Sequence, residues 1–201
     1  MNMPSAFARL ALVLLAGLSL GSCGRQAEQG RPPLQGAALG GPFALVDQNG
    51  RPTTDKNFAG RYRAIYFGYS FCPDVCPTTL QALMQGYRTF AAASPTAAAR
   101  LVPIFITVDP ERDTPVVLKS YVSAFGPQLV GLTGSPAAIG AAAKEFGVYS
   151  HRRVAPAESN DYLVDHSSQV ILLGPDGAPI ALVPTDQGAK AVADTFGRWV
   201  Q

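Results

Sequence analysis

The chain has 201 residues, of which 47% are hydrophobic and 15% are charged. This length and composition fit one globular domain with short appendages, and they exclude a disordered or collagen-like chain. The 16 basic and 14 acidic side chains are spread along the sequence, so no polybasic stripe is present to neutralise phosphates, and we expect no nucleic-acid partner. The three cysteines are an odd number, so at least one sulfur of an exported chain has a role other than an intramolecular disulfide.

The first segment has the features of an export signal. Arg9 precedes an apolar stretch, residues 10–20, that is well short of the roughly 20 residues needed to span a membrane. Small residues then precede Cys23, and this boundary resembles the bacterial lipobox, whose cysteine becomes the lipid-modified N-terminus. We therefore expect a lipoprotein signal peptide over residues 1–22 and lipidation at Cys23, with an uncleaved anchor or an ordinary secretory cleavage as the alternative.

The segment after Cys23 resembles a linker. Residues 24–41 combine Gly, Pro, Gln and Ala without apolar periodicity, which is typical of a flexible tether. We expect a tether over residues 23–41 and a folded domain over residues 42–201. Such a domain would stand on the periplasmic side of a bacterial cell envelope, with the inner membrane as the expected location. Gly24 is not the aspartate associated with inner-membrane retention in some bacteria, so the outer membrane stays open.

Apolar patterning predicts strands and helices that alternate along the domain. A leading hairpin is expected where residues 43–47 run into Asn49-Gly50, since this dipeptide supplies the positive φ angles of tight turns. A β-branched and aromatic strand, residues 63–69, leads towards an amphipathic helix over residues 78–90. The later expected elements are strands at 101–108, 129–132, 162–164, 169–173 and 180–183, and helices at 114–125, 135–146 (with Ser135 as N-cap) and 186–200. This order predicts an α/β, thioredoxin-like fold with an insertion between its halves.

Two cysteines stand at the junction between the aromatic strand and the helix that follows. Cys72 and Cys76 are four positions apart, a spacing that can bring both sulfurs to one side of a helical turn. A helix N-terminus stabilises a thiolate, which can then act as a nucleophile or as a soft metal ligand. The alternative is a static disulfide or two inert core thiols. Thiol–disulfide oxidoreductases usually carry two residues between their cysteines, whereas three stand here, so the spacing weakens the redox interpretation without excluding it.

A metal site at these cysteines needs a third ligand, and the chain has only two histidines. His151 precedes two arginines that disfavour a bound cation, so we expect it to be a solvated surface residue. His166 lies between two strand-like segments and is either a ligand or a hydrogen-bonded core residue. Two thiolates and one imidazole select Cu(I) and can hold Cu(II), whereas zinc prefers a fourth ligand that the sequence does not obviously offer.

Three motifs follow one another along the domain: YSFCPDVCP at 69–77, VDPERDTP at 108–115 and DYLVDHS at 161–167. Together they resemble the Sco/SenC family of copper-binding assembly factors for cytochrome c oxidase. The resemblance implies a peroxiredoxin-related thioredoxin fold, in which a central mixed sheet is flanked by helices and preceded by the leading hairpin. It also implies that Cys72, Cys76 and His166 are the copper ligands.

The function that the resemblance implies is that of a membrane-tethered copper metallochaperone. Its copper, as Cu(I) or Cu(II), would go to the CuA site of cytochrome c oxidase subunit II or to another copper-accepting membrane protein. Other periplasmic copper chaperones and thioredoxin-like reductants are the further partners considered. The alternative is a thiol–disulfide reductase, with Cys72 and Cys76 as its redox pair, that keeps the cysteines of the recipient reduced. A peroxidase is disfavoured, because the arginines closest in sequence to the cysteines are Arg63 and Arg88.

Acidic side chains accompany both parts of the expected site. Asp74 and Asp165 lie next to the expected ligands, where they can orient the imidazole or tune the basicity of the donors. The cluster at residues 109–113 has the carboxylates of a hard-cation site. The structural interpretation is preferred for this cluster, because Asp113 or Thr114 can cap the helix that follows.

Overall fold

The fold is organised around a mixed sheet of seven strands in the order β2-β1-β5-β4-β3-β8-β9. The computed structural model describes residues 30–154 and 162–201, so the expected signal peptide and Cys23 lie outside the described residues. The strands of this sheet are β1 (Ala44–Asp47), β2 (Pro52–Thr54), β3 (Tyr62–Gly68), β4 (Leu101–Thr107), β5 (Val130–Thr133), β8 (Val170–Leu173) and β9 (Pro179–Val183). The strand that leads to the cysteines, β3, has hydrogen-bonded neighbours on both sides.

The central strands are buried on both faces. All seven residues of β3 and all seven of β4 are buried, and the two strands pair in parallel. Parallel strands covered on both faces have continuous apolar sequences, which explains why these two segments do not alternate with polar residues. On the other side of β3, β8 pairs with it in antiparallel orientation, while β5 continues the parallel part beyond β4.

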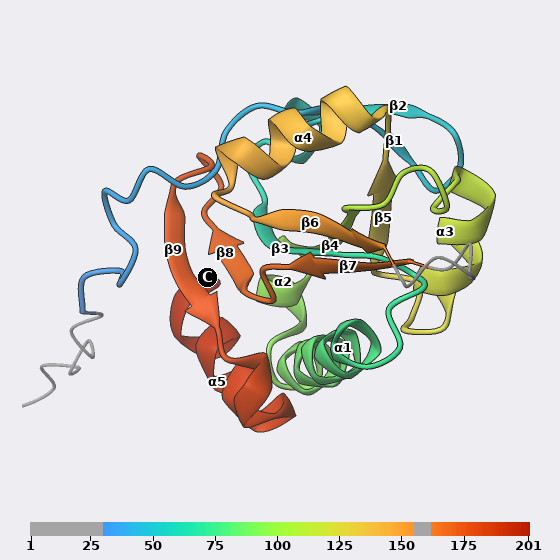
Figure 1. Ribbon diagram of the computed structural model, residues 1–201. Coiled ribbons are helices and arrows are strands. Elements are labelled where there is room, and N and C mark those ends of the chain that lie inside the picture. The colour runs from blue at the N-terminus through green and yellow to red at the C-terminus, as the bar shows by residue number, and fades with distance from the viewer. Residues whose placement is uncertain (1–29, 155–161) are drawn as a thin grey trace, which may run out of the picture. The chain divides into compact units, whose positions relative to one another are not determined.

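Helices form a layer on each face of the sheet (Figure 1). Alternate residues of β3 divide between the layers: Tyr66 belongs to the core cluster with α1, α3 and α5, and Phe67 to the cluster with α4. The helices are α1 (Val75–Ala93), α2 (Pro95–Ala98), α3 (Pro115–Ser123), α4 (Pro136–Glu145) and α5 (Ala189–Trp199), with 3-10 helices η2 (Asp55–Phe58) and η3 (Thr185–Gln187). Across residues 30–154 and 162–201, no helix combines the length and hydropathy of a membrane span.

The expected turn and caps are present. The leading hairpin is β1 paired with β2, and the turn between them contains Gly50 at a φ of +79°. Ser135 caps α4 by accepting the N–H of Ala138. Of the two expected caps for α3, Thr114 takes the role by accepting the N–H of Val117. The α/β class, with a mixed sheet between helices, is therefore as predicted.

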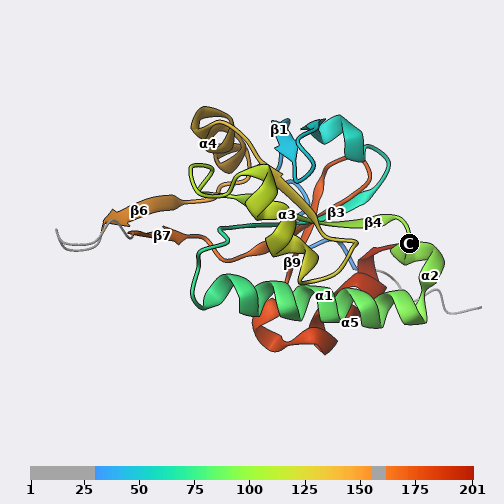
Figure 2. The same ribbon diagram turned by 90° about the vertical axis from the view of Figure 1, so that its right-hand side faces the viewer.

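An additional pair of strands was only half predicted. β6 (Ser150–Val154) and β7 (Tyr162–His166) form a separate two-stranded antiparallel sheet, called here the β6–β7 ribbon. Figure 2 shows this ribbon projecting from the rest of the fold. The sequence predicted β7 only as far as Val164 and did not predict β6, whose His151 is exposed as expected.

The folded unit begins before Pro42. Residues 31–41 were expected in the tether, but they lie against the domain and form one unit with it from Arg31 onward. The N–H of Leu34 donates to the carbonyl of Ile180, and the N–H of Gly40 donates to the carbonyl of Glu145. These contacts place the last part of the expected tether on the surface of the folded domain.

Helices α1 and α5 approach each other so closely at Gly86 that a side chain does not fit. A Cβ atom added at Gly86 would lie 2.4 Å from Val192 Cγ1 and 2.8 Å from the carbonyl oxygen of Ala189. We expect Gly86→Ala to lower the free energy of unfolding by about 1–3 kcal/mol through overpacking, measured by urea denaturation.

The matched control for this substitution is Gly140→Ala in α4. Position 140 is exposed, and an added Cβ there has no neighbour within 4 Å. Gly140→Ala should therefore raise the free energy of unfolding by about 0.5–1 kcal/mol, since alanine in a helix loses less conformational entropy than glycine. If Gly86→Ala left the free energy of unfolding unchanged or raised it as Gly140→Ala does, the close packing of α1 on α5 would be refuted.

Candidate metal centre

Two thiols and one imidazole converge where β3 ends and α1 begins. Cys72 lies in the turn after β3, Cys76 lies in the first turn of α1, and His166 ends β7. The two Sγ atoms and a ring nitrogen of His166 all lie within 4.8 Å of one another. Cys76 Sγ is 3.2 Å from His166 Nε2, although the two residues are 90 positions apart in the sequence. The fold thus brings together the three residues that the sequence proposed as ligands.

The backbone around the cysteines leaves room for the sulfur atoms. A Cβ atom at Gly68, the last residue of β3, would lie 2.9 Å from Cys76 Sγ and 2.9 Å from Phe105 Cε2. Glycine at this position therefore lets the Cys76 sulfur rest against the sheet. The Sγ of Cys72 accepts the backbone N–H of Cys76 at 3.4 Å, which is one of the amides that a helix leaves free at its N-terminus.

Burial decides the protonation state of Cys76. Its side chain is 0% exposed, and burial raises the pKa of its thiol to about 12, against the opposing effect of polar groups of Tyr66 and Tyr69 beside the sulfur. The expected stabilisation of a thiolate by the helix N-terminus does not hold for this residue, because desolvation outweighs it. The reduced Cys76 is a neutral thiol at neutral pH, so a metal ion that binds it must displace a proton.

His166 is held in the tautomer that presents a free nitrogen lone pair to the sulfurs. Its Nδ1 lies 2.8 Å from the carbonyl oxygen of Ser167. A carbonyl oxygen only accepts, so Nδ1 carries the hydrogen and the lone pair of Nε2 faces Cys76. Burial lowers the pKa of His166 below its ordinary value, while the Ser167 carbonyl and the charge of Asp165 oppose the change. The imidazole is therefore neutral and oriented for metal binding.

The two expected acidic neighbours lie outside the cluster of donors. Asp74 is exposed and forms no hydrogen bond or ion pair through its carboxylate with the residues that the structure describes. Asp165 is also exposed, and its carboxylate lies 3.5 Å from the guanidinium of Arg153. Asp165 therefore acts on the site through its charge, which favours the protonated imidazole of His166.

In the acidic cluster at residues 109–113, the carboxylates of Asp109 and Asp113 accept hydrogen bonds from other groups of the protein. The buried carboxylate of Asp113 accepts the N–H of Ser70 at 3.0 Å, the hydroxyl of Ser70, and the hydroxyl of Thr107 at 2.6 Å. Asp109 accepts the guanidinium of Arg112 at 2.5 Å. Within the described ranges, this cluster has no arrangement suited to a metal ion. The network that ties Ser70 to Asp113 was missed by the sequence, which gives no signal for contacts between residues 43 positions apart.

Tyr66 was also missed, and no sequence signal was available for it. An aromatic residue in a buried strand is most simply a core residue, and its ring is indeed fully buried in β3. Its hydroxyl lies beside Cys76, and burial raises the pKa of this phenol above its ordinary value, with the nearby Cys76 adding to the rise. The Tyr66 ring also contacts the imidazole of His166 edge-on, at 6.1 Å between centroids. Tyr66 thus forms part of the wall behind the donors.

Comparisons with known proteins establish the family of this chain. The SCO1/SenC family model matches residues 31–201. The chain belongs to the SCO1/SenC family. The mitochondrial SCO1 homologue of Mus musculus is 43% identical over 139 residues, which are 69% of this chain and 48% of that protein. The mitochondrial SCO2 homologue of Bos taurus is 36% identical over 206 residues, covering 97% of this chain and 76% of that protein. The chain thus spans about half the length of the mouse SCO1 relative.

Solved structures of the family share the fold. ScoI of Bradyrhizobium japonicum with copper bound superposes with a TM-score of 0.72 at 39% identity, covering 81% of this chain and 100% of that one. Yeast Sco1 with copper bound gives a TM-score of 0.73 at 38% identity, covering 81% and 88%. These neighbours confirm the predicted family and the thioredoxin-like fold. The donor set of the SCO1/SenC chain described here, two sulfurs and one imidazole, fits a soft metal ion such as copper.

The two cysteines should differ in reactivity. In reduced, metal-free protein at neutral pH, we expect iodoacetamide to modify Cys72 well before Cys76, because the thiolate is the reactive form and Cys76 is the more buried residue, 0% exposed against 9% for Cys72, with its pKa raised to about 12. Mass spectrometry of the digested protein at successive times measures both rates. In urea the two rates should become similar, and equal rates in the folded protein would contradict the geometry.

Proposed function

We propose that this chain is a membrane-tethered copper metallochaperone that delivers copper to the CuA site of cytochrome c oxidase subunit II. The observation that carries the proposal is the convergence of Cys72, Cys76 and His166 within 4.8 Å. Support comes from family members that are 36–39% identical to this chain and have been solved with copper bound.

The donor geometry suits a cargo that is held and then released. The two thiols lose their protons when copper binds, and His166 already offers a free lone pair, so the ion receives three donors. No fourth His, Cys, Asp or Glu of the described residues joins them. An incoming ligand from the recipient can therefore attack the ion without first displacing a protein donor, and the three bonds can be exchanged one at a time.

The surface beside the donors is suited to contact with a partner protein. Phe71 directly precedes Cys72 and Val75 directly precedes Cys76, and their side chains are 53% and 41% exposed. Large apolar side chains that stand in water next to a site favour protein contact, and the near-neutral charge of the chain fits a protein partner better than a polyanion. We infer that oxidase subunit II, or another copper-accepting membrane protein, docks here. Other copper chaperones and thioredoxin-like reductants would supply the copper and the electrons.

A second function, thiol–disulfide reductase, is favoured by one observation: the two sulfurs lie close together but differ in exposure. The Cys72 thiolate would attack a disulfide of the recipient, forming a mixed disulfide and releasing one recipient thiolate. Cys76 would then attack Cys72 Sγ, which breaks the mixed disulfide, and its proton would pass to the recipient sulfur that leaves. The recipient leaves with two thiols, and the chain retains the Cys72–Cys76 disulfide, having given two electrons.

His166→Ala separates the two functions. For a metallochaperone, we expect the purified, reduced protein to lose copper affinity by more than the roughly 10–100-fold that removing an outer partner of a metal ligand produces. Competition with a chromophoric Cu(I) chelator measures the affinity, and oxidase assembly in cells should fail in parallel. The matched control is His151→Ala, which removes the other, exposed histidine and should change neither quantity.

The contrary outcomes are equally definite. If oxidase assembly survives His166→Ala but fails in Cys72→Ser, the reductase is favoured over the metallochaperone. If folded, reduced wild-type protein stays free of copper after loading, the metallochaperone proposal is wrong.

The proposed tether rests on the sequence around Cys23, with a signal peptide over residues 1–22 and a lipid anchor that holds the domain on the periplasmic side of the inner membrane. We expect a bacterial host fed an alkyne-tagged palmitate to label the wild-type chain and to leave Cys23→Ala unlabelled, since the lipobox cysteine is the acceptor. In-gel fluorescence measures the label. Cys72→Ser is the matched control and should keep it, whereas label on Cys23→Ala would contradict the lipid anchor.

A further inference from the structure

The third proposed donor, His166, lies on a strand that is not paired with the main sheet. His166 ends β7, and the β6–β7 ribbon belongs to its own two-stranded sheet, separate from the sheet that positions the cysteines. Figure 2 shows the ribbon extending away from the body of the domain. The distance of 3.2 Å between His166 Nε2 and Cys76 Sγ therefore depends on contacts other than strand pairing.

Several of those contacts gather on Tyr162, the first residue of β7. The guanidinium carbons of Arg112 and Arg152 lie 3.6 Å and 3.5 Å from the centroid of its ring. Two groups this close to one centroid must stand on opposite faces, because one face has room for only one of them. The Tyr162 hydroxyl donates to Asp109 at 2.7 Å. We call these four residues, Asp109, Arg112, Arg152 and Tyr162, the Tyr162 clamp.

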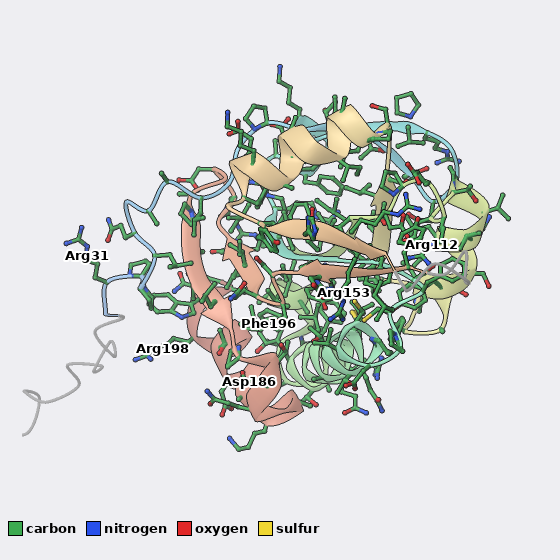
Figure 3. All side chains as sticks on the ribbon, in the orientation of Figure 1. Arg31, Arg112, Arg153, Asp186, Phe196 and Arg198 are labelled. Atoms are coloured by element: carbon green, nitrogen blue, oxygen red, sulfur yellow. The ribbon has the colours of Figure 1, made fainter. Side chains whose placement is uncertain are left out.

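Arg112 joins the ribbon to the body through several contacts, and Figure 3 shows it beside the ribbon. Its Nε donates to Asp109 at 2.5 Å, and its Nη1 donates to the carbonyl of Tyr162 at 3.1 Å. Its guanidinium carbon also lies 4.9 Å from the ring centroid of Phe71, the residue before Cys72. Charge-assisted bonds between largely buried groups are stronger than exposed ion pairs, so these contacts resist opening.

The clamp continues into the segment that carries the cysteines. The N–H of Asp109 donates to Thr107 Oγ1 at 2.9 Å, and the Thr107 hydroxyl donates to Asp113 at 2.6 Å. Asp113 in turn accepts the N–H of Ser70, two residues before Cys72, at 3.0 Å. One unbroken set of hydrogen bonds thus connects the turn before the cysteines with the strand that ends at the histidine.

We propose that the Tyr162 clamp sets the position of His166 relative to the two cysteines, which makes Arg112 and Tyr162 positioning residues for the third copper ligand. This inference rests on the ligand set of the proposed function. A metal site needs its donors held to about 0.5 Å, and a ribbon freed from the body would let the imidazole drift from the sulfurs. Copper would then be left with two thiolates.

The first test is a double-mutant cycle on the full chain. Arg112→Gln removes the charge and both polar contacts, and we expect Cu(I) affinity to fall about 10–100-fold. In the background of His166→Ala, the same substitution should cause no further loss, because its effect passes through the imidazole. Losses that add in the double variant, or an unchanged affinity in Arg112→Gln alone, would overturn the proposal.

The second test needs no copper. The imidazole of His166 meets the ring of Tyr69 edge-on, with centroids 5.8 Å apart, so NMR of the metal-free protein should show nuclear Overhauser effects between the two rings. We expect these signals to weaken in Arg112→Gln and in the milder Tyr162→Phe, which removes only the hydroxyl bond to Asp109. If these signals persist in both variants, the clamp does not position His166, whatever the copper affinities of the variants are.

The matched control is Arg88→Gln. Arg88 is an exposed arginine of α1 that also donates to a backbone carbonyl of another segment, that of Phe125, at 3.0 Å. This variant should keep both the copper affinity and the ring signals. If it lost either, the effect of Arg112→Gln would be explained by general loosening of the fold, and the proposal would be overturned. A separate result would show that the proposed ligand set is wrong: a His166→Ala variant that binds copper as tightly as the wild type does.

Discussion

The approach of Cys76 Sγ to His166 Nε2, 3.2 Å, is the contact on which the proposed copper site depends. Each side of it is fixed by a different device. On the cysteine side, Gly68 provides the space in which the sulfur sits against the sheet. On the histidine side, the carbonyl of Ser167 holds the Nδ1 hydrogen, so that the remaining lone pair is directed at the sulfur. Neither Gly68 nor Ser167 is a proposed ligand, but both set how the sulfur and the imidazole face each other.

Desolvation and metal binding oppose each other at this contact. Burial keeps Cys76 protonated, with its pKa raised to about 12, and keeps His166 neutral. In the absence of metal, these two groups therefore place no uncompensated charge inside the protein, which would be costly at this depth. A soft cation changes this balance, since its charge compensates the thiolates that it creates. The same groups are thus stable both as a neutral cluster and as a metal site.

The sequence was sufficient to propose the three side chains that the fold brings together and to predict most of the order of elements. It was insufficient wherever burial or long-range contact decides the structure. The continuous apolar runs of β3 and β4 are recognisable because both faces are covered. β6 is not, since its Ser-His-Arg-Arg stretch has no apolar alternation and pairs only with β7. The packing of residues 31–41 depends on isolated apolar side chains such as Leu34, which have no periodicity. The acidic cluster was correctly assigned to structure, but its role in joining Ser70 to Tyr162 required three-dimensional proximity.

The burial of Cys76 also affects how the two cysteines respond to an oxidant. Peroxides attack thiolates that water can reach, and a neutral, fully covered thiol is a poor target. The first oxidation would therefore fall on Cys72, giving a sulfenic acid. Because the Cys76 sulfur lies within 4.8 Å, condensation to a disulfide with loss of water competes with further oxidation to the irreversible sulfinic acid. Cys76 thus favours oxidation of the pair to a disulfide, which a cellular reductant can reverse.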